Sequence, residues 1–240
     1  MLSLNNDFLG YHPQNHNVLF SGSDTEELFT ENLKTKPNDW YYRTNQISYV
    51  RNINGHRCKN IEEIDLDNYI LFAGCSHTEG IGLKLEDTYP YLLSKKMNCD
   101  YYNLSIGGTG VDTLSYNLVT WFAKIKKPPK LLIVQWPHNV RLILQKFPIE
   151  AELFNSYGIW NKETSNLLLL GDQHNLFNTM TTLTKKLIYN IVTCPIIEVK
   201  VIKDKNADVA ITFNQIDYAR DEHLGVESQK INTELIYKAI

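Results

Sequence analysis

From Tyr69 onward, apolar runs alternate with amphipathic stretches, and this alternation restricts the fold more than any other feature of the chain. The runs YILFA (Tyr69–Ala73) and LLIVQ (Leu131–Gln135) are almost wholly apolar and of strand length, which is typical of strands buried on both faces of a parallel sheet. Two further strands are predicted at Asp100–Leu104 and Ile196–Ile202. The predicted helices are Thr88–Met97, Val111–Ile125, Asn178–Val192 and Glu227–Ala239. Strands separated by helices of roughly 10–15 residues predict βαβ units and therefore an α/β fold.

The regular alternation does not cover the whole chain. Residues 1–65 are polar and aromatic-rich, without a regular period, and predict an irregular N-terminal extension packed on the main body. One short strand is predicted within them, at Gln46–Val50. Residues 66–240 form the predicted α/β domain, in which residues 147–172 break the rhythm and predict an insertion over one end of the sheet.

Composition excludes several classes of protein. With 43% hydrophobic residues among 240, the chain can bury a core, so global disorder is excluded. The 24 basic and 27 acidic residues give a net charge of −3, so a nucleic-acid partner is not expected. No secretory signal is visible and no apolar run approaches the ~20 residues of a membrane-spanning helix, so we expect a cytoplasmic protein without a membrane span. The cysteines and histidines show no CxxC or HExxH spacing, so neither a metal nor another cofactor is expected.

Residues that follow the predicted strands are the candidate site, because ligands of open parallel sheets bind beyond the carboxyl ends of the strands. The first strand is followed by the glycine-rich turn Gly74–Gly82, in which Ser76 lies near the start of a short helix. The second is followed by the loop Asn103–Gly110, and the third by WPHN at 136–139. Asp221 and His223 stand in a loop before the last helix, where the carboxylate can turn back and hold one tautomer of the imidazole. The turn has neither the lysine of a P-loop nor a GxGxxG order, which disfavours a nucleotide site.

Taken in order, these four blocks resemble those of the SGNH (GDSL-like) hydrolase family, from Tyr69 to the end of the chain. The resemblance implies a three-layer α/β/α fold with a central, mostly parallel sheet, of the SGNH/flavodoxin-like kind. It also implies a serine esterase or acyl hydrolase that needs no cofactor. The substrate implied is an O-acyl ester of a carbohydrate or of another small molecule.

The same resemblance assigns roles to individual residues. Ser76 is the implied nucleophile, His223 the general base, and Asp221 the acid that orients the imidazole. The implied oxyanion hole consists of the backbone N–H groups of Ser76 and Gly108 together with the side chain of Asn139.

Some of these assignments stay open at the level of the sequence. The acid of the family usually stands three residues before the histidine, a position that Arg220 occupies here, so Asp221 is the available carboxylate. His138 is an alternative to Asn139 as the oxyanion donor. Cys75 stands where the family has an acidic residue and fits a small buried side chain better than a nucleophile. The competing function is a catalytically inactive binding or structural module of the same fold. An acyl transferase or carbohydrate O-deacetylase is a variant of the esterase hypothesis.

Overall fold

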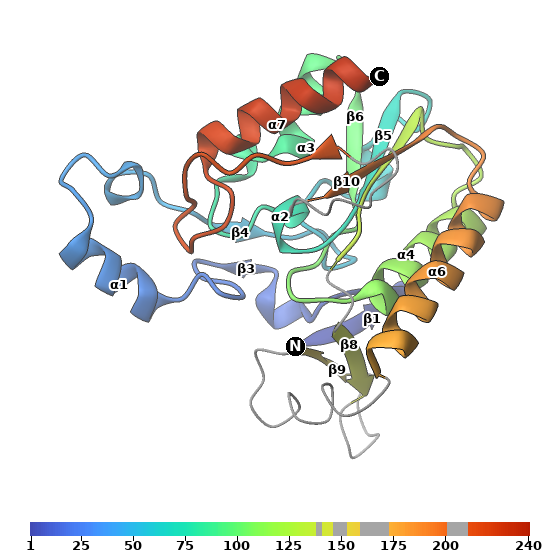
Figure 1. The fold of residues 1–240 in the computed structure, drawn as a ribbon, viewed down its shortest axis with the longest axis horizontal. Coiled ribbons are helices and arrows are strands. Elements are labelled where there is room, and N and C mark those ends of the chain that lie inside the picture. The colour runs from blue at the N-terminus through green and yellow to red at the C-terminus, as the bar shows by residue number, and fades with distance from the viewer. Residues whose placement is uncertain (138–140, 146–152, 159–172, 201–210) are drawn as a thin grey trace.

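A five-stranded sheet forms the centre of the protein, in a computed structural model that describes residues 1–137, 141–145, 153–158, 173–200 and 211–240 (Figure 1). In spatial order its strands are β11 (Ile211–Thr212), β10 (Ile196–Lys200), β7 (Leu131–Gln135), β5 (Tyr69–Ala73) and β6 (Asp100–Asn103). All neighbouring pairs are parallel, and Leu71 on β5 lies opposite both Tyr102 and Leu132. The predicted α/β fold with a parallel central sheet is confirmed.

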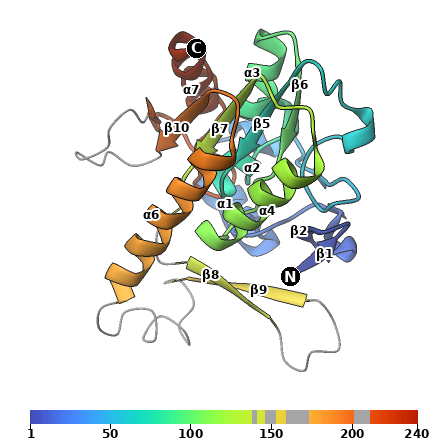
Figure 2. The ribbon, with the colours of Figure 1, turned by 90° about the vertical axis from the view of Figure 1, so that its right-hand side faces the viewer.

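Helices cover both faces of this sheet (Figures 1 and 2). On one face α3 (Tyr89–Lys96) packs against α7 (Val226–Ala239), and on the other α4 (Val111–Lys124) packs against α6 (Gln173–Ile191). The predicted three-layer α/β/α arrangement is therefore confirmed. No helix in the described part of the chain is both long enough and apolar enough to cross a membrane.

The elements predicted from Tyr69 onward agree closely with the observed ones. β5 and β7 have the predicted bounds, because all five residues of each strand are buried and the runs end at loop residues. α6 begins at Gln173, earlier than the predicted Asn178, and its first three residues are polar and show no helical period. The last two residues of the strand predicted at Ile196–Ile202 lie outside the described residues.

A second, antiparallel sheet is not predicted by the sequence. Its spatial order is β2 (Phe8–Tyr11), β1 (Leu2–Asn5), β9 (Leu153–Gly158) and β8 (Arg141–Gln145). The remaining elements are η1 (Pro13–Asn15), β3 (Asn17–Val18), α1 (Glu26–Thr35), η2 (Tyr41–Arg43), β4 (Tyr49–Val50), η3 (Ile61–Glu63), α2 (Ser76–Glu79) and η4 (Leu85–Asp87). β4 falls within the short strand predicted at Gln46–Val50.

The first 65 residues, which we call the N-terminal segment, contribute to the main core. Phe8 on β2 is 2% exposed and belongs to the same cluster of buried side chains as the strands of the parallel sheet. Its ring lies 6.2 Å from that of Trp121 on α4, which in turn lies 4.5 Å from the ring of Tyr102 on β6. The N-terminal segment is thereby joined to the α/β body by apolar contacts.

His56 is a buried polar residue at the junction between the N-terminal segment and the sheet. Its Nε2–H donates to the carbonyl of Leu9 at 3.0 Å, and its Nδ1 accepts from the hydroxyl of Tyr102 at 3.0 Å. Burial lowers the pKa of His56 to about 4, although the hydrogen bond to Leu9 opposes this effect. The imidazole is therefore neutral in the folded protein at neutral pH.

Lowering the pH from about 7.5 to about 5 is expected to destabilise the protein by about 2 kcal/mol through His56 alone. The unfolded chain binds a proton there near its ordinary pKa of 6.5, whereas the folded protein binds it only near 4. The stabilising contribution is thus complete above the unfolded value and is lost as the pH falls toward the folded one. Urea unfolding at the two pH values should show this dependence in the wild type and in the control His12→Gln, but not in His56→Gln. An equal pH dependence in wild type and His56→Gln would contradict the prediction.

Candidate active site

The edge where β5 and β7 end is a topological switch point. Numbered along the chain from β5, the five strands lie in the order 2-1-3-4-5, which is the flavodoxin-like arrangement. β5 lies between β6 and β7. The chain adds β6 on one side of β5 and all later strands of this sheet on the other side, so the strand order reverses at β5. Sheets of this kind bind ligands in the crevice beyond the carboxyl ends of the strands at that point. Ser76 begins α2 immediately after β5, at this edge.

Ser76, His223 and Asp221 are joined by hydrogen bonds. The hydroxyl of Ser76 lies 2.7 Å from Nε2 of His223, and Nδ1 of His223 lies 2.8 Å from Oδ2 of Asp221. When Nδ1–H donates to the carboxylate, Nε2 is left to accept the proton of the serine hydroxyl. The side chain of Asp221 is fully buried and that of His223 is 18% exposed. The structure thus brings together the three residues that the sequence singles out, with the imidazole of His223 between the hydroxyl and the carboxylate.

A tight turn explains how an acid only two residues before the histidine reaches the imidazole. Glu222 has a φ of 74°, a left-handed conformation that reverses the chain between Asp221 and His223. Backbone hydrogen bonds close the turn, from Ala219 N–H to the carbonyl of His223 at 2.8 Å and from Glu222 N–H to the carbonyl of Ala219 at 3.2 Å. The two-residue spacing therefore needs no carboxylate at the position of Arg220.

The Asp221 carboxylate has hydrogen-bond donors besides the imidazole. The hydroxyl of Ser23 donates to Oδ2 at 2.7 Å, and the backbone N–H of His223 lies 3.4 Å from Oδ1. Burial raises the pKa of Asp221, but the hydrogen bonds from His223 and Ser23 outweigh burial and hold the pKa below its ordinary 3.8. The group is therefore an anion at neutral pH, which is the form that accepts Nδ1–H.

Gly82 makes room for this carboxylate. Its φ is 79°, and a Cβ at this position would lie 2.2 Å from Oδ1 of Asp221. Any side chain there would push the acid away from the imidazole. Gly82 belongs to the glycine-rich turn after β5, so this turn supplies both Ser76 and the space for Asp221.

Gln135, the last residue of β7, fixes the turn that carries Ser76. Its Oε1 accepts from the hydroxyl of Thr78 at 2.9 Å and from the backbone N–H of Cys75 at 3.3 Å, and its Nε2 lies 3.3 Å from Sγ of Cys75. Cys75 is 3% exposed, as expected of a small buried side chain behind the turn. The two central strands are thus tied together where the candidate site begins.

The candidate oxyanion donors are only partly described by the structure. Ser76 is the first residue of α2, so its N–H has no acceptor within the helix. Gly108 lies in the loop after β6 with a φ of 76°, a conformation that favours glycine. Asn139 and its alternative His138 lie outside the described residues.

Glu79 is a site residue that sequence reasoning does not identify. One of its carboxylate oxygens accepts the backbone N–H of Gly107 at 2.6 Å and the hydroxyl of Tyr11 at 3.0 Å. The other accepts from the guanidinium of Arg51 at 2.9 Å, and the side chains of this ion pair are both fully buried. Glu79 therefore links α2, the glycine loop after β6 and the N-terminal segment. The only signal in the sequence is a single acidic residue within the glycine-rich turn.

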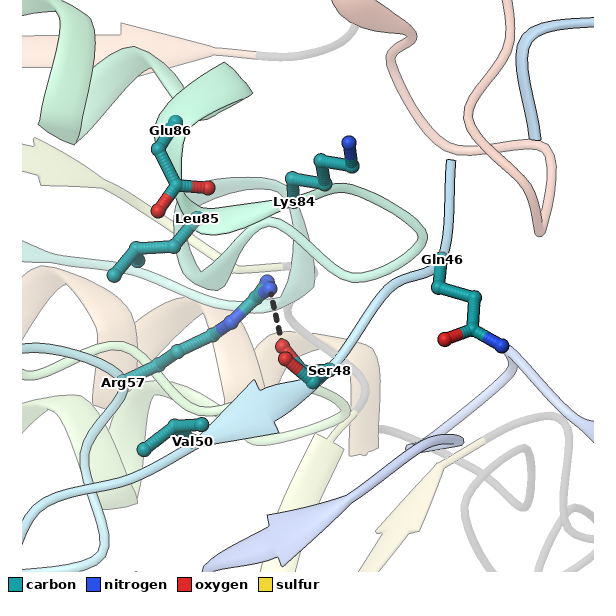
Figure 3. A pocket seen from close by; sticks show the side chains of 7 residues that line it. All are labelled: Gln46, Ser48, Val50, Arg57, Lys84, Leu85 and Glu86. Atoms are coloured by element: carbon teal, nitrogen blue, oxygen red, sulfur yellow. Dashed lines mark hydrogen bonds between the residues drawn. The ribbon is translucent and has the colours of Figure 1, made fainter. Parts of the chain in front are cut away.

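In the part of the chain that the structure describes, neither a metal centre nor the cavity of Figure 3 coincides with Ser76. Among the described residues, no group of three or more His, Cys, Asp or Glu side chains is placed to hold a metal ion. A cavity of about 180 Å³ is lined by Gln46, Ser48, Val50, Arg57, Lys84, Leu85 and Glu86 (Figure 3). Arg57 donates there to the carbonyl of Ser48 at 3.2 Å, so its charge is already engaged by the backbone.

Comparisons with known proteins give structural neighbours only. No family model and no curated protein matches the chain. One solved structure is that of a carbohydrate esterase family 2 enzyme with a carbohydrate binding domain from Corynascus thermopiles (Myceliophthora fergusii), with 12% identity and a TM-score of 0.47 over 80% of this chain and 71% of that one. A family two carbohydrate esterase from Clostridium thermocellum, in complex with cellohexaose, matches with 12% identity and a TM-score of 0.47 over 74% of this chain and 64% of its own.

A third neighbour is a member of the lipolytic protein G-D-S-L family from Veillonella parvula. It has 11% identity and a TM-score of 0.46 over 72% of this chain and 97% of its own. Identities this low leave the functional assignment to the geometry of the residues around Ser76.

Proposed function

We propose that this protein is a serine ester hydrolase that uses Ser76, His223 and Asp221 as a catalytic triad. The observation that supports this most directly is the hydrogen-bonded chain from the Ser76 hydroxyl through His223 to the buried carboxylate of Asp221. A hydroxyl is a weak nucleophile unless an adjacent base removes its proton, and a neutral imidazole oriented by a carboxylate does so near neutral pH. The position of Ser76 at the switch point of the sheet further supports a ligand site there.

In the proposed reaction, Oγ of Ser76 attacks the carbonyl carbon of the ester while Nε2 of His223 takes the hydroxyl proton. The C–O bond to the alcohol then breaks, and the alkoxide leaves with the proton from His223, so that the acyl group remains on Ser76. Water attacks this acyl-enzyme with His223 again as base, which releases the acid and restores the serine. Asp221 stays ionised throughout and stabilises the imidazolium formed in each half-reaction.

The negative oxygen of each tetrahedral intermediate needs donors aimed at it. We assign this role to the N–H groups of Ser76 and Gly108, together with the side chain of Asn139 or, as the alternative, of His138. Loss of one such donor typically costs ~10²–10³ in turnover.

The proposed substrate is an O-acyl ester of a carbohydrate or of another small molecule, and the family resemblance of the four sequence blocks supports this class. The same acyl-enzyme would serve transfer to a sugar hydroxyl if that acceptor replaced water. The four cysteines are free thiols, which supports a reducing compartment such as the cytoplasm as the place of action.

A fluorophosphonate probe tests the proposal without knowledge of the natural substrate. Its phosphorus accepts Oγ of an activated serine and loses fluoride, so we expect one covalent adduct on the wild type, on the peptide that contains Ser76, and none on Ser76→Ala. His223→Gln should label at least about 100-fold more slowly, because the base is lost. A wild type that folds but takes up no probe would instead favour the inactive binding module.

A further inference from the structure

Ser23, in the N-terminal segment, contacts the acid of the proposed triad. Its hydroxyl lies 2.7 Å from Oδ2 of Asp221, the same oxygen that receives Nδ1–H of His223 at 2.8 Å. Two donors on one carboxylate oxygen restrict the rotation of the carboxylate more than one donor does. They also share its negative charge. Ser23 thus acts on the group that orients the base and not through a hydrogen bond to the base itself.

The turn that presents Ser23 is closed on itself. Ser21 N–H donates to the carbonyl of Asp24 at 2.9 Å, and Asp24 N–H donates to the carbonyl of Ser21 at 3.1 Å. Between them Gly22 has a φ of 63°, which the reversal of the chain requires. Ser23 therefore lies in a hairpin turn whose backbone is held by hydrogen bonds at both ends, with its side chain against Asp221.

A buried ion pair attaches this turn to the loop that carries the acid. Asp24 accepts from Nε of Arg220 at 2.6 Å and from Nη2 at 2.5 Å, and both side chains are almost fully buried. Asp24 also accepts from the hydroxyl of Tyr49 at 2.5 Å. Asp24 follows Ser23 and Arg220 precedes Asp221 in the sequence. The ion pair between Asp24 and Arg220 therefore holds Ser23 and Asp221 close to each other.

We propose that Ser23 is a positioning residue of the active site, whose hydroxyl holds the Asp221 carboxylate toward Nδ1 of His223 and moderates the charge that the imidazole meets. The catalytic part of this role rests on the proposed function, whereas the effect on His223 exists without turnover. Removing the hydroxyl leaves more negative charge on Oδ2, which stabilises the imidazolium, and frees the carboxylate to rotate. Because of the added charge, His223 should gain its proton at higher pH. Because the carboxylate can rotate, the imidazole should be less well oriented and act less efficiently as a base.

The test is an NMR titration of the His223 ring, assigned with His223→Gln, together with the kinetics of p-nitrophenyl acetate hydrolysis. In Ser23→Ala we expect the titration midpoint of His223 to rise by about half a pH unit, and the acidic limb of the kcat/KM profile to move with it. We expect kcat to fall about 3- to 10-fold while KM changes less than about 2-fold. Ser23→Thr keeps the hydroxyl, so its His223 midpoint and its kcat should both be close to those of the wild type. Ser3→Ala, in the same segment but bonded to Asn5, is the matched control and should behave as the wild type.

A double-mutant cycle separates positioning from a merely structural contact. On the Asp221→Asn background, Ser23→Ala should change neither the His223 midpoint nor kcat further, because the group through which it acts has been altered. If Ser23→Ala changes neither the His223 midpoint nor kcat, the hydroxyl has at most a structural role in the turn, whether or not the melting temperature falls. That outcome would contradict the proposal. If the wild type hydrolyses no ester but Ser23→Ala still raises the His223 midpoint, ester hydrolysis would be refuted and the action of Ser23 on His223 would still be supported.

Discussion

Replacing Ser76 by alanine is expected to lower the kcat for a short p-nitrophenyl ester by a factor on the order of 10⁵ or more, to the limit of detection. The substitution removes the only atom proposed to bond to the acyl carbon. The residual rate then reflects binding and oxyanion contacts alone. Among the described residues, the Ser76 hydroxyl hydrogen-bonds to Nε2 of His223 and, at 4.0 Å, to Sγ of Cys75, so the fold should be retained without it. The measurement is a burst and steady-state assay together with thermal unfolding.

Two further variants make this expectation specific. Asp221→Asn should lower kcat about 10⁴-fold, because an amide favours the wrong tautomer of His223. Ser115→Ala is the matched control, since its hydroxyl bonds to the carbonyl of Val111 within α4 and to Thr184 on α6. Ser115→Ala should retain full activity. Equal rates for wild type and Ser76→Ala would show that Ser76 is not the nucleophile.

Replacing Glu79 by glutamine is expected to destabilise the protein by about 3–5 kcal/mol. The amide is nearly isosteric, but it leaves the guanidinium of Arg51 buried without its counter-charge. Arg51 lies 3.6 Å from the centre of the Tyr11 ring, and this contact alone does not replace an anion. Urea or thermal unfolding with intact two-state behaviour measures the effect.

The matched control for Glu79→Gln is Glu234→Gln. Glu234 pairs with Lys96 at 2.6 Å, but the two side chains are 50% and 33% exposed. Water and salt screen such a pair, so its loss should cost less than about 1 kcal/mol. Similar losses in the two variants would mean that the pair of Arg51 and Glu79 contributes no more than a surface contact.

The parts of this protein that the sequence predicts well are those with a local signal. β5 and β7 are continuous apolar runs, so their bounds follow from hydrophobicity alone. Ser76 and the Asp221–His223 pair could be found because each stands directly after a predicted strand or before a predicted helix. The approach of these residues to one another then follows from the parallel order of the strands.

What the sequence does not predict depends on partners far away in the chain. β1 and β2 are four residues each, and β1 also pairs with β9, some 150 positions away, so neither strand has a pattern that stands out locally. Glu79 meets Arg51 across 28 residues and Ser23 meets Asp221 across 198. No periodicity encodes such pairs, since either member alone is typical of a surface loop.

The contact between Ser76 and His223 spans 147 residues, and that between Asp24 and Arg220 spans 196. While the chain is being synthesised, Ser76 leaves the ribosome long before the residues that are proposed to activate it. An emerging chain therefore carries an ordinary, unreactive alcohol at this position. The proposed nucleophile acquires its reactivity only when the C-terminal loop has docked on the turn at Ser21–Asp24, so labelling of Ser76 would report completed folding of the individual molecule.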